Sequence, residues 1–410
     1  MWRRRLLVGL IVRECTAVRF ALREPKHEAS DLEWVRTTIA RCLGTQQNHT
    51  CKELNKVAHR DYPPLRVACE HGFLPEVREL LSMGADLHVR LPSDGGQVIH
   101  YASAQGQLDV VKLLIEEGAD VTSLTSAGCT PLHYTAAAAI AHPKQQAAVA
   151  RTLIAEGVDI DARTEDGLTA LYTAATILAA DVIQVLLKAG ADTSLSATNA
   201  DGGGPIHLVV DEKDASLTKM LLDAGADPNA VDDFGTVPLH IAVWQGWTDG
   251  VRILAEAGGD VNARSDANDT PLHIAAFRGS TNVVRQLLRS GADVEAGPIT
   301  PFGLTCSLTA LRRGDVRTTK QNVAAAKLLI KAGATKRLAN MDDPSIRDDI
   351  ASRRHPREGS PESSWKRTRP KSCYSWRSRS GTGRRATNLV RARRRAPRRT
   401  ERRASTQPKP

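Results

Sequence analysis

Recurring histidines are the residues of this sequence whose spacing could do chemistry, because imidazole binds zinc and exchanges protons near neutral pH. The set is His100, His133, His207, His240 and His273, whose neighbouring members lie 33 or 74 residues apart. A zinc ion needs three or four ligands within about 2 Å. Histidines that are supplied one per structural unit cannot converge on one ion. We therefore expect them to make hydrogen bonds near helix starts and to link neighbouring units.

Other catalytic motifs are missing from the sequence. Gly202-Gly203-Gly204 lacks the Lys and Ser/Thr of a phosphate-binding loop, and no Gly-x-Ser-x-Gly or His-Glu-x-x-His motif occurs. The seven cysteines form no Cys-x-x-Cys pair, which indicates mostly reduced thiols and an intracellular protein. The longest apolar run, Leu6–Val12, is far shorter than the roughly 20 residues of a membrane span. The sequence thus predicts a protein that is not an enzyme, with no metal, cofactor, small-molecule substrate or membrane span.

The histidines belong to an internal repeat. A glycine that is usually followed by a small residue and Asp recurs at spacings of 34, 39, 33, 35, 33, 33 and 42 residues, from Gly84 to Gly333. Upstream lies a second phrase, clearest in Thr130-Pro131-Leu132-His133, Val237-Pro238-Leu239-His240 and Thr270-Pro271-Leu272-His273. A period near 33 with Thr-Pro-Leu-His-x-Ala resembles the ankyrin repeat. The resemblance implies an all-α solenoid of stacked helix-turn-helix units joined by hairpin-like loops.

The resemblance divides the chain into three parts. Residues 1–60 are expected to form an N-terminal segment with a capping helix, and residues 341–410 a basic, disordered tail. The third and eighth repeats carry insertions. We expect about eight repeats between the two ends, at about 61–95, 96–127, 128–165, 166–200, 201–234, 235–267, 268–300 and 301–340.

The seventh repeat shows why each unit should form two helices. Thr270 can cap a helix whose first turn holds Pro271, where the missing N–H costs nothing. Gly279 ends that helix, and apolar residues at helical spacing over 283–288 predict a second, amphipathic one. Gly291 comes just past its end, where the left-handed conformation favours glycine. The recurring Asp of the Gly-Ala-Asp phrase is predicted to be a turn residue.

The N-terminal segment contains a predicted helix. Ser30-Asp31-Leu32-Glu33 has the pattern of a capping box, and Trp34, Val35, Ile39 and Leu43 then share one face. We expect this helix to cap the first repeat, because the end of a solenoid needs a lid. The alternative concerns the stretch before it. Met1–Arg5 followed by Leu6–Val12 has some features of an N-terminal targeting sequence.

The positive charge lies at the ends of the chain. Residues 353–410 carry a net charge of +17 and residues 1–60 of +6, whereas residues 61–352 carry −13, which together give +10. The tail has too few apolar residues to offset the entropy of ordering. Thr387 and Ser405 follow basic residues and are candidate phosphorylation sites. Candidate nuclear-import or nucleic-acid patches are two basic runs of the tail, which contain Lys366, Arg367, Arg369, Arg393, Arg394 and Arg395.

The resemblance also implies where a partner binds. Ankyrin proteins bind partners on the concave face, with the loop tips and the exposed side of each first helix. Exposed aromatic residues beside an arginine are typical of interface hot spots, and such residues occur in repeats 6 and 7. Asp211 and Glu212 of repeat 5 lie nearby, so the patch favours a partly basic, partly apolar peptide. The alternative for Trp244 is packing into the groove between helices. The predicted partner-binding residues are Asp233, Phe234, Trp244, Gln245, Asp266, Asp269, Phe277 and Arg278.

The sequence therefore predicts noncovalent protein binding by an adaptor or scaffold in the cytoplasm, the nucleus or both. One alternative is a nuclear regulator whose tail contacts nucleic acid or import factors while the repeats recruit a protein. A less favoured alternative is a substrate adaptor for a ubiquitin ligase, although no ligase-recruiting box is evident after residue 340. The identity of the partner is not encoded in the repeat pattern, since one fold serves many functions.

The nucleic-acid alternative makes a quantitative prediction. If residues 353–410 contact DNA phosphates, counterion release makes the affinity fall steeply as salt rises. Fluorescence anisotropy should then show a steep slope of log affinity against log salt for the full chain, and no such slope after deletion of residues 353–410. A full chain that fails to bind DNA at low salt contradicts this alternative.

Overall fold

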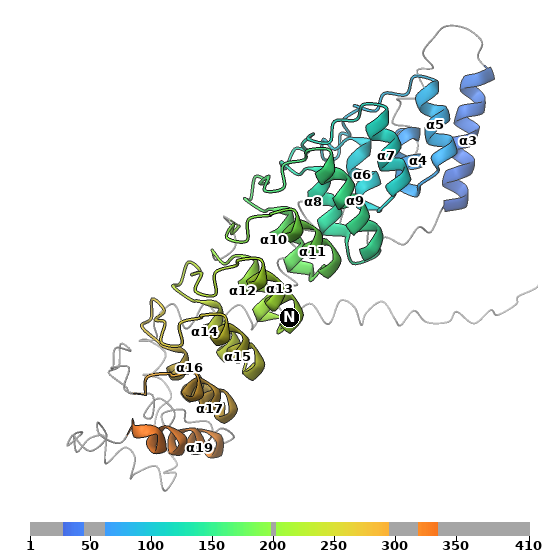
Figure 1. The fold of residues 1–410 in the computed structure, drawn as a ribbon. Helices are drawn as coiled ribbons and strands as arrows, with labels where there is room; N and C mark the ends of the chain where they lie inside the picture. Colours follow the sequence, from blue (N-terminus) through green and yellow to red (C-terminus); the bar gives the residue numbers. More distant parts are fainter. Residues whose placement is uncertain (1–27, 45–61, 198–201, 295–318, 335–410) are drawn as a thin grey trace, which may run out of the picture. The chain divides into compact units, whose positions relative to one another are not determined.

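The regular structure of the chain is helical. A computed structural model describes residues 28–44, 62–197, 202–294 and 319–334, and no strand occurs within these ranges (Figure 1). A short π-helix, η1 (Ile330–Ala334), follows the last of the helices. The described helices are α3 (Glu28–Gly44), α4 (Pro64–His71), α5 (Leu74–Ser82), α6 (Val98–Ala104), α7 (Leu108–Glu116), α8 (Pro131–Ala138), α9 (Pro143–Ala155), α10 (Ala170–Ile177), α11 (Ala180–Lys188), α12 (Pro205–Asp211), α13 (Ala215–Asp223), α14 (Pro238–Trp244), α15 (Thr248–Glu256), α16 (Pro271–Arg278), α17 (Thr281–Arg289) and α19 (Thr319–Leu329).

Consecutive helix pairs, from α4 and α5 to α16 and α17, form the body of the described chain. The first helices of neighbouring pairs pack against one another in the order α4, α6, α8, α10, α12, α14 and α16, and the second helices form a parallel series (Figure 1). We call these two series the first-helix row and the second-helix row. The loops that join one pair to the next lie on a common side of the rows (Figure 1). This layering confirms the predicted all-α solenoid of helix-turn-helix units.

The local signals of the seventh repeat are confirmed. Helix α16 begins at Pro271, and the Thr270 hydroxyl accepts a hydrogen bond from the His273 N–H. Gly279 and Gly291 have φ values of 67° and 86° after the two helices. The insertion of the third repeat is also visible, because α9 has 13 residues whereas the other second helices from α5 to α17 have nine. The corresponding insertion of the eighth repeat, 312–321, lies mostly outside the described residues.

Four of the five recurring histidines link neighbouring repeats, as predicted; for His273 only the contacts to its own helix start are present among the described residues. Nδ1 of His240 accepts the N–H of Val237 at 3.2 Å, and its Nε2 lies 3.1 Å from the carbonyl oxygen of Asp269 in the next loop. Because Nδ1 is the acceptor, Nε2 must carry the proton, which fixes the neutral tautomer. The same pair of contacts, one to the helix start and one to a carbonyl in the following loop, is made by His100, His133 and His207.

The recurring Asp is confirmed as a turn residue. Its Oδ1 accepts the N–H of the residue two positions later, at 2.8 Å from Asp86 to His88 and at 2.8 Å from Asp260 to Asn262. Equivalent bonds are made by Asp120, Asp159, Asp192 and Asp227. These bonds shape each loop from its own residues, before any contact with a neighbouring repeat.

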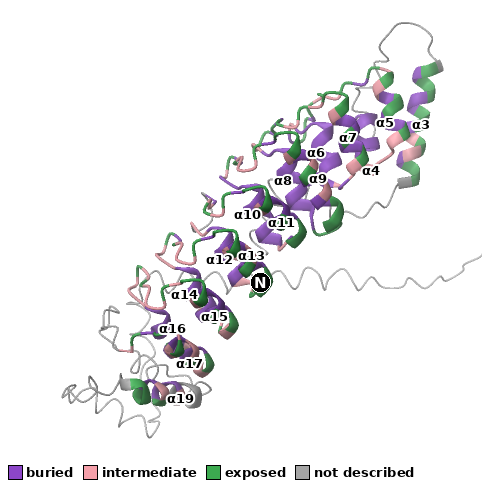
Figure 2. Cartoon of the chain, in the orientation of Figure 1, coloured by how far each residue is buried: buried purple, intermediate pink, exposed green. Residues whose placement is uncertain are grey.

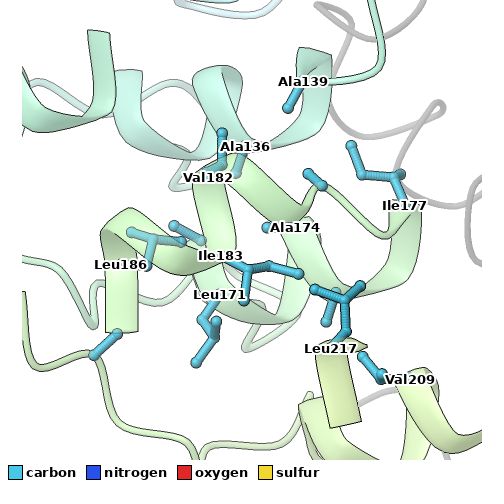
Figure 3. Packing of buried hydrophobic residues seen from close by; sticks show 14 of the residues in the cluster. Ala136, Ala139, Leu171, Ala174, Ile177, Val182, Ile183, Leu186, Val209 and Leu217 are labelled. Atoms are coloured by element: carbon cyan, nitrogen blue, oxygen red, sulfur yellow. The ribbon is translucent and has the colours of Figure 1, made fainter. Parts of the chain in front are cut away.

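The core runs continuously between the two rows. Leu171, Ile183 and Leu186 are completely buried, and side chains from successive helices meet among them (Figure 3). Alanines such as Ala136 and Ala174 lie where first helices pack side by side, and their small side chains permit that close approach. Figure 2 shows buried residues between the rows and exposed ones on the outer surfaces. Each repeat is therefore stabilised mainly by its neighbours.

Helix α3 covers the first helix pair. It packs against α4 and α5, with Val35 and Ile39 buried and the Asp31 carboxylate 3.1 Å from Nε2 of His71. Two details of the prediction were wrong. The helix begins at Glu28, so Ser30 lies inside it and is not the N-cap. Leu43 is 57% exposed, because packing on α4 and α5 turns Cys42 inward instead.

Cys69 and Cys129 are free and buried cysteines. Burial raises the pKa of the Cys69 thiol. None of the described helices has the length and apolar character needed to cross a membrane. The predicted tail, with its basic patches and phosphorylation sites, lies outside the described residues, as does the predicted targeting stretch.

Acid should destabilise the fold through the buried histidines. Burial lowers the pKa of His100 from 6.5 to about 4, and also lowers the pKa values of His133, His207 and His240. The unfolded chain then binds more protons below pH 6.5, so stability falls as the pH drops from 6.5 towards 4. His100 alone should account for a loss of about 2 kcal/mol between pH 7 and pH 5, measured by urea unfolding.

The contribution of His100 can be separated by substitution. In His100→Asn, the difference in unfolding free energy between pH 7 and pH 5 should shrink by about 2 kcal/mol, although the variant is less stable throughout. His142→Gln, at an exposed position before α9, serves as the control and should leave the pH dependence unchanged. An unchanged pH dependence in His100→Asn contradicts the assignment.

Candidate protein-binding surface

Two neighbouring loops hold one part of the predicted surface. In the loop before α14, Oδ1 of Asp232 accepts the N–H groups of Phe234 and Thr236 at 2.9 and 2.8 Å. The next loop is tied to it, because the N–H of Asp266 donates to the carbonyl oxygen of Phe234 at 3.0 Å. Asn268 adopts the left-handed conformation, with φ of 60°, at the place where other loops have glycine. The loops are therefore positioned by hydrogen bonds of their own backbone.

The ends of two first helices hold the other part. Trp244 is the last residue of α14, and Phe277 and Arg278 are the last two residues of α16. The Arg278 guanidinium carbon lies 4.9 Å from the centroid of the Trp244 ring, which is a cation–π geometry. Phe277 is 39% exposed, an unusual exposure for a large apolar side chain. These adjacent helices thus present aromatic surface with an arginine held against it.

A cross-repeat hydrogen bond adds to this arrangement. Nε2 of Gln245 donates to Oδ1 of Asp211 at 2.6 Å, which joins the end of α14 to the end of α12. Trp247, in contrast, packs against the hydrophobic core. Trp244 is only half-buried and keeps part of its ring accessible.

The acidic residues of the surface differ in environment. Asp233 and Asp266 are exposed in their loops, whereas Asp269 is half-buried. Burial raises the pKa of the Asp269 carboxyl to about 6, because the charged form loses contact with water. Asp269 also supplies the carbonyl that His240 contacts. Its role is therefore partly structural, and the two exposed carboxylates are the better candidates for contact with a partner.

The structure brings Trp244 and Arg278 together and ties Phe234 to the neighbouring loop. A gathering of Phe234 with Trp244 and Phe277 stays a prediction. Sequence reasoning missed Val231, which is 63% exposed in the loop before α14 and adds apolar area close in sequence to Phe234. The available signal was an isolated valine among polar loop residues, a pattern too common to single it out.

A second cluster that sequence reasoning missed is buried in the first repeats. The Arg66 guanidinium carbon lies 3.4 and 4.1 Å from the ring centroids of Tyr62 and Tyr101. The hydroxyls of Tyr101 and Tyr134 donate to the Asp94 carboxylate at 2.5 and 2.7 Å. The two hydroxyls and the carboxylate satisfy one another inside the protein, so the cluster has a structural role. Within the described ranges, no group of three or more His, Cys, Asp or Glu side chains is placed to hold a metal ion.

Comparison with known proteins agrees with this geometry. A family model of ankyrin repeats matches in three copies, over residues 35–125, 99–197 and 206–297. The chain belongs to the ankyrin repeat family. Its repeats therefore form a protein–protein interaction domain.

Several curated proteins are similar to part of the chain. Ankyrin repeat and SOCS box protein 16 of Mus musculus is 35% identical over 173 residues, which are 41% of this chain and 37% of the relative. The human form is 40% identical over 70 residues, or 17% of this chain and 15% of that protein. Neurogenic locus notch homolog protein 1 of Xenopus tropicalis is 26% identical over 199 residues, covering 45% and 6% respectively. The chain spans well under half the length of each of these relatives.

Solved ankyrin repeat domains are also similar to the chain. The domain of Bcl-3, a member of the IkappaB protein family, is 28% identical with a TM-score of 0.48, covering 56% of this chain and 99% of that one. The human ASB11 domain is 25% identical with a TM-score of 0.45, covering 55% and 96%.

The buried carboxyl of Asp269 predicts a stabilising substitution. Since its pKa is raised, the folded state holds a proton more tightly than the unfolded state, and stability is lost as the pH rises through about 4 to 6. Asp269→Asn removes the buried charge and should raise the unfolding free energy at pH 7.5 by up to about 1 kcal/mol, after allowance for partial exposure. The gain should vanish near pH 4. Asp266→Asn, at an exposed neighbouring position, should change the urea midpoint little; an equal gain in both variants contradicts the assignment.

Proposed function

We propose that this protein is a non-enzymatic adaptor or scaffold that binds a protein partner through the loops and first-helix ends of repeats 6 and 7. The observation that carries the proposal is the pairing of Trp244 with Arg278 beside the exposed ring of Phe277. Tryptophan, tyrosine and arginine side chains contribute a large share of the binding energy of an interface when a partner covers them. The residues that contribute are Asp233, Phe234, Trp244, Gln245, Asp266, Asp269, Phe277 and Arg278.

Rigidity supports this choice of surface. Gln245 is held by Asp211, and Arg278 is held over Trp244, so these long side chains have little rotamer freedom left to lose on binding. Side chains that are already ordered cost less to immobilise against a partner. The loops are likewise fixed by their own hydrogen bonds. The surface is therefore preorganised for binding, although its side chains come from different repeats.

Charge supports the class of partner. Asp233 and Asp266 are exposed on the loops, and residues 61–352 carry a net charge of −13. The one arginine of the patch lies against an aromatic ring, so the surroundings of the aromatic residues are mainly acidic. A peptide segment with apolar and basic side chains complements such a surface. Cytoplasmic or nuclear action fits an adaptor of this kind, and the basic tail is our candidate for nuclear import.

Removal of the two aromatic side chains tests the proposal. Trp244→Ala/Phe277→Ala should lose the partners that the wild-type chain retains in an affinity pulldown, with a loss of binding free energy of about 2 kcal/mol or more for a purified partner. The far-UV circular dichroism signal should stay unchanged, because both side chains lie at helix ends outside the main core.

A matched control separates binding by this surface from nonspecific hydrophobic binding. Ile140→Ala removes an apolar side chain that is 52% exposed in the turn between α8 and α9. It should retain every partner. The proposal is wrong if the double variant keeps all partners, or if the control loses the same ones.

A further inference from the structure

The first helices of repeats 5, 6 and 7 contact one another through equivalent side chains at their ends. Gln245, after α14, donates to the Asp211 carboxylate at the end of α12 at 2.6 Å. One repeat further on, the Arg278 guanidinium carbon lies 4.9 Å from the centroid of the Trp244 ring. In both contacts the eighth residue, counted from the proline that starts the helix, reaches back to the seventh residue of the preceding repeat. These four residues and Phe277 form one continuous surface, which we call the helix-end strip.

The chemistry of the helix-end strip changes in order along the stack. Its repeat-5 end carries the carboxylate of Asp211, and Glu212 follows it in the chain. Trp244 comes next, and Phe277, which is 39% exposed, belongs to the repeat after that. An acidic position is thus followed by two aromatic positions, one in each repeat. A partner segment that covers the whole strip must present a basic group and then two apolar groups in the same order.

The Asp211 carboxylate has room for a basic side chain of a partner. An ionised carboxylate has two acceptor oxygens, and Gln245 donates to Oδ1 only. Within the described ranges, no Lys or Arg forms an ion pair with Asp211, the exposed Lys213 of the next turn included, and Asp211 is partly exposed. The bond from Gln245 also orders the carboxylate, so a second donor meets an acceptor that is already in place.

The spacing of the strip matches an α-helix that lies along it. The first helices pack side by side in the order α12, α14 and α16, and packed helices lie about 8–10 Å apart (Figure 1). In an α-helix, seven residues span about 10.5 Å and return to nearly the same face, because one turn takes about 3.6 residues. A helix along the row therefore offers one side chain to each repeat, at every seventh residue.

The backbone of the row favours a helix over an extended chain. Carbonyls in the last turns of α12, α14 and α16 already accept hydrogen bonds from the turns that follow, as Ala242 does from the N–H of Trp247 at 2.9 Å. An extended segment placed there would lose water from its own N–H and C=O groups and gain few hydrogen bonds in return. A helical segment satisfies these groups internally, so it binds through its side chains.

The strip is also wide enough for one face of a helix. Leu208 and Ile274 each lie three residues before a strip residue, on the same side of α12 and α16, and both are partly exposed. Ile241, at the equivalent place of α14, is buried. The strip thus has apolar surface beside it at both ends, which complements the broad apolar face of an amphipathic helix.

We propose that the partner binds through an amphipathic α-helix that lies along the ends of α12, α14 and α16. A basic residue of this helix pairs with Asp211, and apolar residues about seven and fourteen positions away cover Trp244 and Phe277. The inference rests on the function proposed above and adds the conformation of the bound segment and the order of its side chains.

Selection from two peptide libraries tests the conformation. Each library randomises three positions, about seven residues apart in an alanine-rich helical scaffold and about three residues apart in a proline-rich extended scaffold. The full chain should enrich helical peptides that carry Lys or Arg at one end position and large apolar residues at the other two. The best of them should bind about tenfold more tightly than the best extended peptide. Equal or tighter binding by extended peptides overturns the proposal.

Removal of the Asp211 charge tests the order of the side chains. Asp211→Asn keeps an oxygen that accepts the Gln245 bond but loses the charge. Its affinity for the best helical peptide should fall about fivefold, and changing the basic residue of that peptide to Gln should then cost no further affinity. Asp223→Asn, at an exposed carboxylate that ends α13 in the second-helix row, is the matched control and should bind as the wild type does. An unchanged affinity in Asp211→Asn, or an equal loss in both variants, contradicts the assignment.

Failure of this inference and failure of the proposed function give different results. If no peptide of either library binds the wild-type chain more tightly than Trp244→Ala/Phe277→Ala, both are wrong. If extended peptides bind best and depend on these two aromatic residues, the surface stands and the helical partner is wrong. If helical peptides bind but ignore Asp211→Asn, the proposed pairing with Asp211 is wrong.

Discussion

The neutral imidazole that joins one repeat to the next is the interaction on which the described stack depends. In His240 one ring nitrogen accepts from the start of its own helix while the other contacts a carbonyl of the following loop. The contact works only while the ring is neutral, because a protonated Nδ1 would face the N–H of Val237. Burial keeps it neutral by disfavouring the charged form. A polar contact thus links neighbouring repeats that are otherwise held together by apolar packing.

In two repeats another residue replaces the recurring histidine. Arg66 occupies the histidine place in the first repeat, and Tyr172 in the fourth. Arg66 is completely buried, between Tyr62 and Tyr101 and close to the cover that α3 forms. A buried guanidinium requires compensation, and the two rings together with Glu70, 3.3 Å away, supply it. The first repeats are consequently specialised for burial, and the later ones retain accessible side chains.

The two halves of the first-helix row have the same helix arrangement but carry different side chains in the last turns of their helices. Where the last turns carry alanine and threonine, as in α6, α8 and α10, the row is buried. Where they carry Trp244 and Phe277, the row keeps aromatic surface accessible. The helix positions are equivalent by repetition, so the different side chains contribute to the difference in exposure. A repeat architecture separates shape from specificity in this way, because each layer contributes only one or two residues to the surface.

The sequence by itself determined the features that depend on residues close together in the chain and on the repeat period. The helix pairs, the turn function of the recurring Asp, the linking histidines and the longer α9 all follow from residues within one repeat, and each is present. The start of α3 was misjudged because a capping pattern at Ser30 does not prevent a helix from beginning earlier. Its buried face was misjudged because contact with α4 and α5 selected Cys42 over Leu43.

Only the tertiary structure decided how side chains of different repeats meet. The stacking of Arg278 on Trp244 and the hydrogen bond from Gln245 to Asp211 each join two layers. Such contacts depend on the rotation and spacing of one helix pair relative to the next, and residue types thirty positions apart do not encode that geometry. The same holds for the burial of α6, α8 and α10, since the burial of a helix end depends on what lies over it as well as on its own residues.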